Sequence, residues 1–455
     1  MICSNLSYLE PELMDIVRLF PEAEKLTIFH TLEGMQNIFR IGEEEYRFEV
    51  QPVRAGEARE YEKKALVKRY AKLALYRLLS KLYNRALPWG ALTGIRPTKL
   101  AYREIELGHD FLPLLEAMEV SDGNISLVGR VLDTQTGLYR KEEGDCDLYV
   151  SLPFCPTRCS YCSFITAPIA ATKQYMGEYL ACLKKEIESA KPLIKNLRSV
   201  YVGGGTPFVL ETEELEEVFK MIAPLRMNGC EYTVEAGRAD VFTKEKLDLC
   251  KKYGVTRICI NAQSFSDCTL ERIGRKHTGG DVERAFEMAK PYGFIVNCDL
   301  IAGLTGESVE EFAGSVERAI ALEPENITVH TLCLKKGARL KEETAALGDE
   351  GMQEMISLSR KKLTAAGYEP YYLYRQKYMA GAHENVGWTK KGCASVYNID
   401  VMEETANNLA VGANAISKRV ILGEGRIERI ASPKDIPTYL NKVDKLIEEK
   451  NKLFL

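Results

Sequence analysis

Residues 146–335 alternate between strand-like and helix-like segments, and this rhythm limits the fold more than any other feature of the sequence. Short runs rich in β-branched and aromatic residues are separated by amphipathic helical patterns. The runs are Leu148–Leu152, Ser199–Val202, Tyr232–Glu235, Arg257–Asn261, Ile295–Ile301 and Ile327–Thr331. Alternation of this kind predicts a parallel β/α architecture. Because six units are too few for a closed eight-stranded barrel, a partial barrel or an open doubly wound sheet remains.

Local signals mark the ends of two helices within this segment. Thr243 is placed to cap the helix after the third run, and Gly254 follows the last turn of that helix. Ser308 and Glu311 have the spacing of a capping box for a later helix. These signals support the assignment of helices between the strands.

The whole chain has 455 residues, which predicts two or three domains. We expect an N-terminal α/β accessory domain at 1–140, a β/α core at 146–340 and a C-terminal mixed α/β domain at 341–455. Between residues 54 and 104 there are 13 Lys and Arg against 4 Asp and Glu. This basic segment is either a docking surface for an acidic electron donor or polyanionic ligand, or a solvated helix face.

Composition and charge exclude several other classes of protein. A net charge of −4 gives no reason to expect nucleic-acid binding, and no apolar run is long enough to predict a membrane span. The first residues lack the pattern of a signal peptide, so we expect a cytoplasmic protein. In a reducing compartment most of the 13 cysteines are expected to be small buried hydrophobic residues, as for Cys3, Cys182, Cys230, Cys250 and Cys298.

Three cysteines stand apart from the others. Cys155, Cys159 and Cys162 form a C-x3-C-x2-C loop directly after the first strand of the β/α segment. Thiolates on one tight loop can converge on an iron–sulfur cubane, and three of them leave one iron open for chemistry. Structural zinc is an alternative, although the second C-x2-C pair typical of such sites is absent from the sequence. Three unliganded core cysteines are the other alternative.

Glycine and polar residues follow the next strands. The second run leads into Gly203–Gly204–Gly205–Thr206, where the backbone can approach a ligand closely. Glu235, Gln263 and Asp299 come at or after the ends of later runs. Because β/α folds bind ligands at the carboxyl ends of their parallel strands, we expect these residues to share one polar site.

These motifs together resemble the radical SAM superfamily, whose signature is the C-x3-C-x2-C loop. The resemblance implies a partial (β/α)6 barrel of the radical SAM type. It also implies a [4Fe–4S] cluster on Cys155, Cys159 and Cys162 and S-adenosyl-L-methionine (SAM) bound at the open iron. An electron from the cluster then cleaves SAM to methionine and a 5′-deoxyadenosyl radical.

The β/α segment is most similar to the oxygen-independent coproporphyrinogen-III oxidase family. Nearly the whole chain, including LTGIRPTKL in the N-terminal region, resembles the HemZ (coproporphyrinogen dehydrogenase) branch. The resemblance implies that a set of residues contacts the cofactors. The set is Tyr149, Tyr161, Gly204, Gly205, Thr206, Glu235, Gln263, Arg275, Asp299 and Cys333.

The reaction implied is oxidative decarboxylation of two propionates of coproporphyrinogen III to vinyl groups, with a reduced flavodoxin or ferredoxin-type protein as electron donor. Arg238, Arg375 and Lys377 are candidate clamps for the propionate carboxylates, with ordinary surface charges as the alternative. Phe164 stands where the characterised oxidases have a further cysteine. Two other interpretations therefore stay open: a haem chaperone or haem-modifying protein of the same family, and a radical SAM enzyme with a substrate other than a tetrapyrrole.

Overall fold

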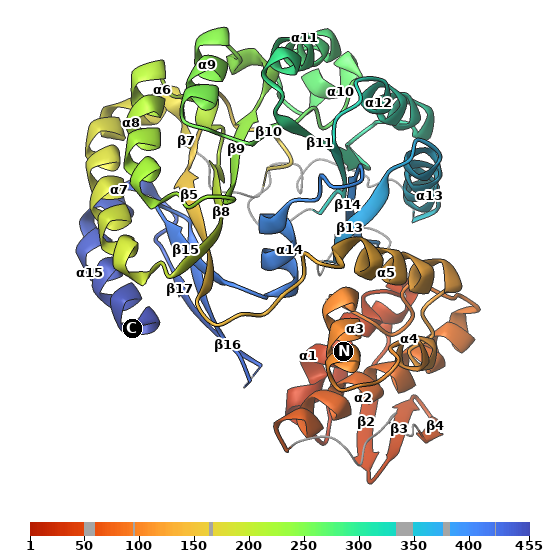
Figure 1. The fold of residues 1–455 in the computed structure, drawn as a ribbon. Coiled ribbons are helices and arrows are strands. Elements are labelled where there is room, and N and C mark those ends of the chain that lie inside the picture. The colour runs from red at the N-terminus through yellow and green to blue at the C-terminus, as the bar shows by residue number, and fades with distance from the viewer. Residues whose placement is uncertain (50–59, 94–95, 163–166, 334–348, 376–382, 424) are drawn as a thin grey trace. The chain divides into compact units, whose positions relative to one another are not determined.

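The computed structural model describes residues 1–455 except 50–59, 94–95, 163–166, 334–348, 376–382 and 424. The chain forms two compact units (Figure 1). Unit 1 comprises 1–132 and 373–384, and unit 2 comprises 133–372 and 385–455. The boundaries expected at 140 and 341 stay predictions.

Unit 2 is built on the parallel strands that the sequence predicts. In spatial order they are β5 (Asp145–Leu152), β8 (Asn196–Gly204), β9 (Glu231–Gly237), β10 (Arg257–Ile260), β11 (Ile295–Ala302) and β12 (Asn326–Thr331). Each pairs in parallel with its neighbour. The predicted caps are also present, because Thr243 accepts a hydrogen bond from the amide of Lys246 and Ser308 forms a capping box with Glu311.

C-terminal strands extend this sheet at both edges. β14 (Asn385–Thr389) pairs antiparallel with β12, and β13 (Glu369–Tyr374) lies beyond it. On the other side β15 (Asn407–Val411) pairs in parallel with β5, followed by the antiparallel β16 (Ile416–Ile421) and β17 (Arg426–Ala431). The sheet ends at β13 and β17, so within the described residues it is a partial barrel and not a closed one.

Helices cover the outer face of the curved sheet (Figure 1). They are α7 (Met176–Ala190), α8 (Thr212–Ile222), α9 (Lys244–Lys252), α10 (Asp267–Arg272), α11 (Gly279–Ala289), α12 (Val309–Ala321) and α13 (Asp349–Ala365). The terminal helix α15 (Ile436–Phe454) packs on α7. By contrast, α14 (Val396–Glu403) lies on the inner face, where the ring of Tyr397 stacks on that of Tyr201 with 4.4 Å between their centroids.

Alternation along the strands separates the two faces of the sheet. In β5, Leu148 and Val150 are fully buried on the side of the helices. The intervening Tyr149 belongs to the inner face, where its ring stacks on Tyr397. Two acidic residues near the amino end of β5 and on α14 are paired with an arginine. Arg198 bridges Asp145 and Asp400 at 3.1 and 2.8 Å.

A buried ion pair fastens α15 to α7 and to the turn after β15. The carboxylate of Glu186, 1% exposed, accepts hydrogen bonds from Tyr439 at 2.8 Å and from the amide of Gly412 at 2.7 Å. The buried ammonium of Lys450 pairs with its other oxygen. This contact holds the end of the chain against the strand next to β5.

Unit 1 contains a four-stranded sheet and several helices. The sheet order is β1 (Ile2–Ser4), β2 (Ile28–Glu33), β3 (Gln36–Ile41) and β4 (Glu44–Glu49). The helices are α1 (Glu10–Val17), α2 (Glu60–Tyr83), α3 (Pro97–Glu106), α4 (Leu112–Ala117) and α5 (Asp122–Gln135), the last of which ends in unit 2. The middle of α2 is buried, and Lys72 pairs there with Glu12 at 2.7 Å. Lys72 is therefore not part of a solvated basic face, whereas Lys63, Lys64 and Lys81 of the same helix are exposed.

Two further predictions concern the burial of single cysteines and the presence of membrane-spanning helices. Cys230, Cys250 and Cys298 are buried as predicted, whereas Cys3 and Cys182 are only half-buried. Among the described residues, no helix combines the length and the apolar character that a membrane span requires.

Candidate functional site at the carboxyl edge of the parallel strands

The glycine-rich turn after β8 packs directly on the segment that leads to the cysteine loop. Gly204 has a φ of +97°, which favours glycine. A Cβ atom at Gly205 would lie 2.3 Å from the carbonyl oxygen of Phe154, so only glycine fits the observed spacing. The amide of Thr206 donates to this same carbonyl at 2.7 Å. The hydroxyl of Thr206 lies 3.6 Å from the sulfur of Cys155.

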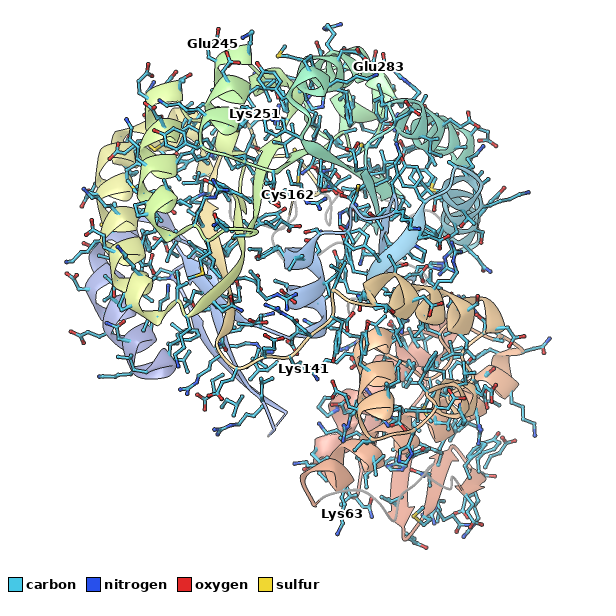
Figure 2. All side chains as sticks on the ribbon, in the orientation of Figure 1. Lys63, Lys141, Cys162, Glu245, Lys251 and Glu283 are labelled. Carbon is cyan, nitrogen blue, oxygen red and sulfur yellow. The ribbon has the colours of Figure 1, made fainter. Side chains whose placement is uncertain are left out.

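The cysteine loop follows β5 and lies within the arc of strands and helices, where Figure 2 labels Cys162. Cys159 is buried, and Cys155 and Cys162 are half-buried. The amide of Cys162 donates to the carbonyl of Cys159 at 3.2 Å, which keeps the loop tight. Within the described ranges the side chains form no ready-made group of three or more metal ligands. Phe164 lies outside the described residues.

The loop is joined to the segment after α10. The amide of Ser160 donates to the carbonyl of Ile273 at 3.0 Å, and the guanidinium of Arg275 donates to the hydroxyl of Tyr161 at 3.1 Å. Arg275 also bonds the carbonyl of Asn261 at the end of β10. Burial raises the pKa of Tyr161, so this hydroxyl stays neutral. The structure thus brings the predicted residues Tyr161 and Arg275 together.

Glu235, near the end of β9, connects the glycine-rich turn to the inner face. Its carboxylate accepts a hydrogen bond from Tyr201 at 2.6 Å and one from the amide of Gly204 at 3.2 Å. Burial, with a smaller effect from Asp299, raises the pKa of Glu235 to about 7. Tyr201 was not predicted as a site residue. Its position two residues before Gly203 places it on the inner face, and that is the signal by which it could have been found.

Gln263 carries backbone strain where the chain leaves β10. Its φ of +67° is uncommon for a residue other than glycine. Two backbone bonds hold it there, from its amide to Asp299 at 2.7 Å and from Ile301 to its carbonyl at 2.9 Å. The side chain is 8% exposed, and its Oε1 has no hydrogen-bond partner among the described residues. Strain together with an unsatisfied buried acceptor is typical of a ligand contact.

Asp299 lies in the second half of β11, three residues before its last residue, and Cys333 follows β12. The carboxylate of Asp299 accepts a hydrogen bond from Asn297 at 2.8 Å and lies 3.8 Å from His330. Burial opposes ionisation of this group, but His330 and the hydrogen bond from Asn297 outweigh it and lower the pKa of Asp299. Cys333 is half-buried, two residues beyond the last residue of β12.

The inner face carries two acidic side chains, Glu235 and Asp299, near this edge. Neither Glu235 nor Asp299 pairs with a lysine or arginine within the described part of the chain. Partly buried carboxylates without a lysine or arginine partner favour binding of a positively charged group. The geometry therefore suits a ligand with a cationic and polar end, held between the glycine-rich turn and Asp299 in β11.

Comparison with known proteins identifies the family. A sequence model of the radical SAM superfamily matches residues 149–319. The oxygen-independent coproporphyrinogen-III oxidase-like protein HemZ of Bacillus subtilis is 36% identical, over 80% of this chain and 76% of its own. The chain belongs to the HemN/HemZ/HemW family of radical SAM proteins. The heme chaperone HemW of B. subtilis is also similar, at 30% identity over 53% of this chain and 67% of its own.

A solved structure supports the fold of this radical SAM protein. The coproporphyrinogen III oxidase HemN from Escherichia coli superposes with a TM-score of 0.55 at 19% identity, covering 68% of this chain and 71% of its own. The cofactors of the family are a [4Fe–4S] cluster and SAM. Three thiols on one loop fit such a cluster, and the glycine-rich turn with the acceptor of Gln263 fits SAM.

The three candidate substrate clamps have different surroundings. Arg238 follows β9 and is 3% exposed, so an ordinary surface charge is wrong for it. Arg375 is buried in unit 1, where it bonds the carbonyl of Leu92 and lies over the ring of Trp89. Lys377 lies outside the described residues. Of the three candidates, Arg238 is the one that lies in unit 2 at a described position. Its charge is already paired with Asp240.

Proposed function

We propose that this protein binds a [4Fe–4S] cluster through Cys155, Cys159 and Cys162 and cleaves SAM reductively. The observation that carries this proposal is the packing of the Gly204–Thr206 turn on the backbone that leads into the cysteine loop. It puts the ends of β5 and β8 in direct contact. When bound, the cluster supplies the electron that cleaves SAM, and a reduced flavodoxin or ferredoxin-type protein supplies the electron to the cluster.

Each predicted residue has a task that its surroundings support. The backbone of Gly204 and Gly205 gives SAM a close approach, since no side chain projects there. Glu235 and Asp299 offer carboxylates to its cationic end, and Gln263 offers a free amide oxygen. Arg275 holds Tyr161 and thereby the loop that carries Cys162. Together these groups hold and orient the ligand and exclude water from it.

The substrate that we propose is coproporphyrinogen III, whose propionates are converted to vinyl groups. Support comes from the similarity to the HemZ protein over most of both chains and from the shared fold of HemN. When bound, SAM would supply the group that abstracts a hydrogen atom from a propionate. Loss of that hydrogen atom, of carbon dioxide and of one electron would leave a vinyl group, and the electron would pass to a one-electron acceptor such as the oxidised form of the flavodoxin or ferredoxin-type protein.

A single anaerobic assay tests both levels of the proposal. The reconstituted protein is incubated with SAM, dithionite and coproporphyrinogen III, and products are separated by chromatography. We expect 5′-deoxyadenosine and protoporphyrinogen IX from the native chain, and neither from Cys159→Ala. Formation of 5′-deoxyadenosine alone would reject the substrate and keep SAM cleavage, whereas full activity in Cys159→Ala would reject the assignment of the cluster.

Haem transfer is the second candidate function. It is favoured by the similarity to HemW proteins and by Phe164, which replaces a cysteine of the characterised oxidases. In this case the protein would bind haem stoichiometrically without oxidising porphyrinogen. Haem titration followed by the Soret band separates the two functions, because a saturable shift at one equivalent supports the chaperone and its absence rejects it.

A further inference from the structure

Each nitrogen of Arg238 has a hydrogen-bond partner inside the protein, although the sequence suggests a substrate clamp. It lies directly after β9 and is 3% exposed. Two of its nitrogens donate to the carboxylate of Asp240, Nε at 2.9 Å and Nη2 at 2.7 Å. The third, Nη1, donates to the hydroxyl of Thr157 at 2.6 Å. All three nitrogens therefore have partners within the chain.

Thr157 lies between Cys155 and Cys159, so its hydroxyl belongs to the cysteine loop. It accepts from Arg238 and donates to the carbonyl of Gly274 at 3.3 Å. One hydroxyl thus ties the loop both to the end of β9 and to the segment before Arg275. The hydrogen bond from the amide of Ser160 to the carbonyl of Ile273 is a second link between the loop and the same segment.

Asp240 fixes the direction of the guanidinium. A bidentate carboxylate holds the planar group in one orientation, which a lysine at this place could not reproduce. The fork therefore aims Nη1 at the loop, and three of the five N–H groups of the guanidinium are used by Asp240 and Thr157. His277 packs beside it, with 3.5 Å between its Nδ1 and an oxygen of Asp240.

We infer that Arg238 is a positioning residue, which with Asp240 and Thr157 holds the first half of the cysteine loop in the conformation that accepts the cluster. This inference rests on the proposed cluster site, and it assigns Arg238 no contact with substrate. A loop held before the cluster arrives loses less conformational freedom when the cysteines bind iron. The clearest consequence is therefore in the order of the loop and in iron retention.

The test measures amide hydrogen exchange in the full-length chain before and after anaerobic reconstitution, together with iron release to a chelator. Thr157→Val removes only the hydroxyl, and Arg238→Gln removes the charge. In both we expect the amides of Ser160 and Cys162 to exchange about tenfold faster or more, because a charge-assisted hydrogen bond is lost. Iron should leave correspondingly faster, with partial recovery in Arg238→Lys.

Arg257→Gln provides the matched control. Arg257 is equally buried, pairs with Glu231 at 3.3 Å and donates to the carbonyl of Cys393 at 3.0 Å, but it lies at the opposite end of the strands. It should lower the unfolding temperature without loosening the loop. Unchanged exchange in both Thr157→Val and Arg238→Gln, or equal acceleration in Arg257→Gln, would overturn the inference.

Failure of the cluster assignment would look different. Cys159→Ala would then keep its iron content. Amide hydrogen exchange before reconstitution would still be faster in Thr157→Val and Arg238→Gln, because it depends on the hydrogen bonds of Thr157 and not on the cluster. A third outcome is specific to the substrate-clamp interpretation. If Arg238→Gln raised only the KM for the porphyrinogen and left loop exchange and iron content as in the native chain, Arg238 would contact substrate and the positioning role would be wrong.

Discussion

Replacement of Gly205 by alanine tests the close packing on which the proposed SAM site depends. The added Cβ atom would lie 2.3 Å from the carbonyl oxygen of Phe154 and 2.7 Å from that of Leu152. Both contacts are with backbone, so a side-chain rotation cannot relieve them. The Phe154 oxygen must retreat by about 0.7 Å before its contact even reaches 3.0 Å. This movement stretches the hydrogen bond from Thr206 and displaces the residue before Cys155.

The magnitude follows from two effects. Overpacking of this kind costs about 1–3 kcal/mol of stability. Misplacement of reacting groups by about 1 Å can cost roughly a hundredfold in rate. We therefore expect Gly205→Ala to lower the free energy of unfolding modestly and the rate of 5′-deoxyadenosine formation by about a hundredfold. Denaturant unfolding and chromatography of the nucleoside measure the two quantities.

Gly314→Ala is the matched control for this experiment. Gly314 is in α12, where an added Cβ atom has no neighbour within 4 Å. Alanine should stabilise this helix by about 0.5–1 kcal/mol and leave SAM cleavage unchanged. The reasoning fails if Gly205→Ala cleaves SAM within twofold of the native rate, since the turn would then tolerate a side chain.

Three other changes have distinct readouts. The pKa of Glu235 is about 7, so a cationic ligand that lowers this pKa should release about half a proton at pH 7. The proton release is measured as a heat of SAM binding that depends on the buffer. Glu235→Gln should abolish this dependence. Without ligand, the raised pKa means that protonated Glu235 contributes stability fully present below its ordinary pKa of 4.5 and lost as the pH rises through about 7. Gln263→Gly removes about 1–2 kcal/mol of left-handed backbone strain. The unfolding temperature of this variant should therefore not fall, while its Kd for SAM should increase. Lys450→Met leaves the buried carboxylate of Glu186 without its cation and should lower the free energy of unfolding in urea by about 3–5 kcal/mol. Much of this loss should be recovered when Glu186→Leu is added.

Local patterns in the sequence were sufficient to predict the parallel strands, and they place the proposed site at the carboxyl edge of these strands. The strands of one parallel sheet have their carboxyl ends at the same edge. Glu235, Gln263 and Asp299 could therefore be placed together without knowledge of packing. The caps at Thr243 and Ser308 were predictable because they involve residues only three positions apart.

Contacts between distant segments could not be predicted in the same way. Nothing local in Asn407–Val411 indicates that it pairs with β5 and not with the end of the β/α segment. The burial of Arg238 depends on Thr157, 81 positions earlier in the chain. An arginine near a strand end was therefore assigned to the substrate, because its carboxylate partner and its loop partner become visible only in three dimensions.

The inner face of the sheet divides into two layers that use the same residue types differently. Near the amino ends of the strands, two acids are matched by arginines, Asp145 by Arg198 and Glu231 by Arg257, although Asp147 accepts from the hydroxyl of Ser199. Near the carboxyl ends, Glu235 has a tyrosine hydroxyl and a backbone amide as partners, and Asp299 an asparagine amide and a neighbouring histidine. A charge left without a counterion in a buried setting costs stability, so folding alone favours the first arrangement. The second is explained if a ligand supplies the missing positive charge, and SAM carries such a charge on its sulfonium.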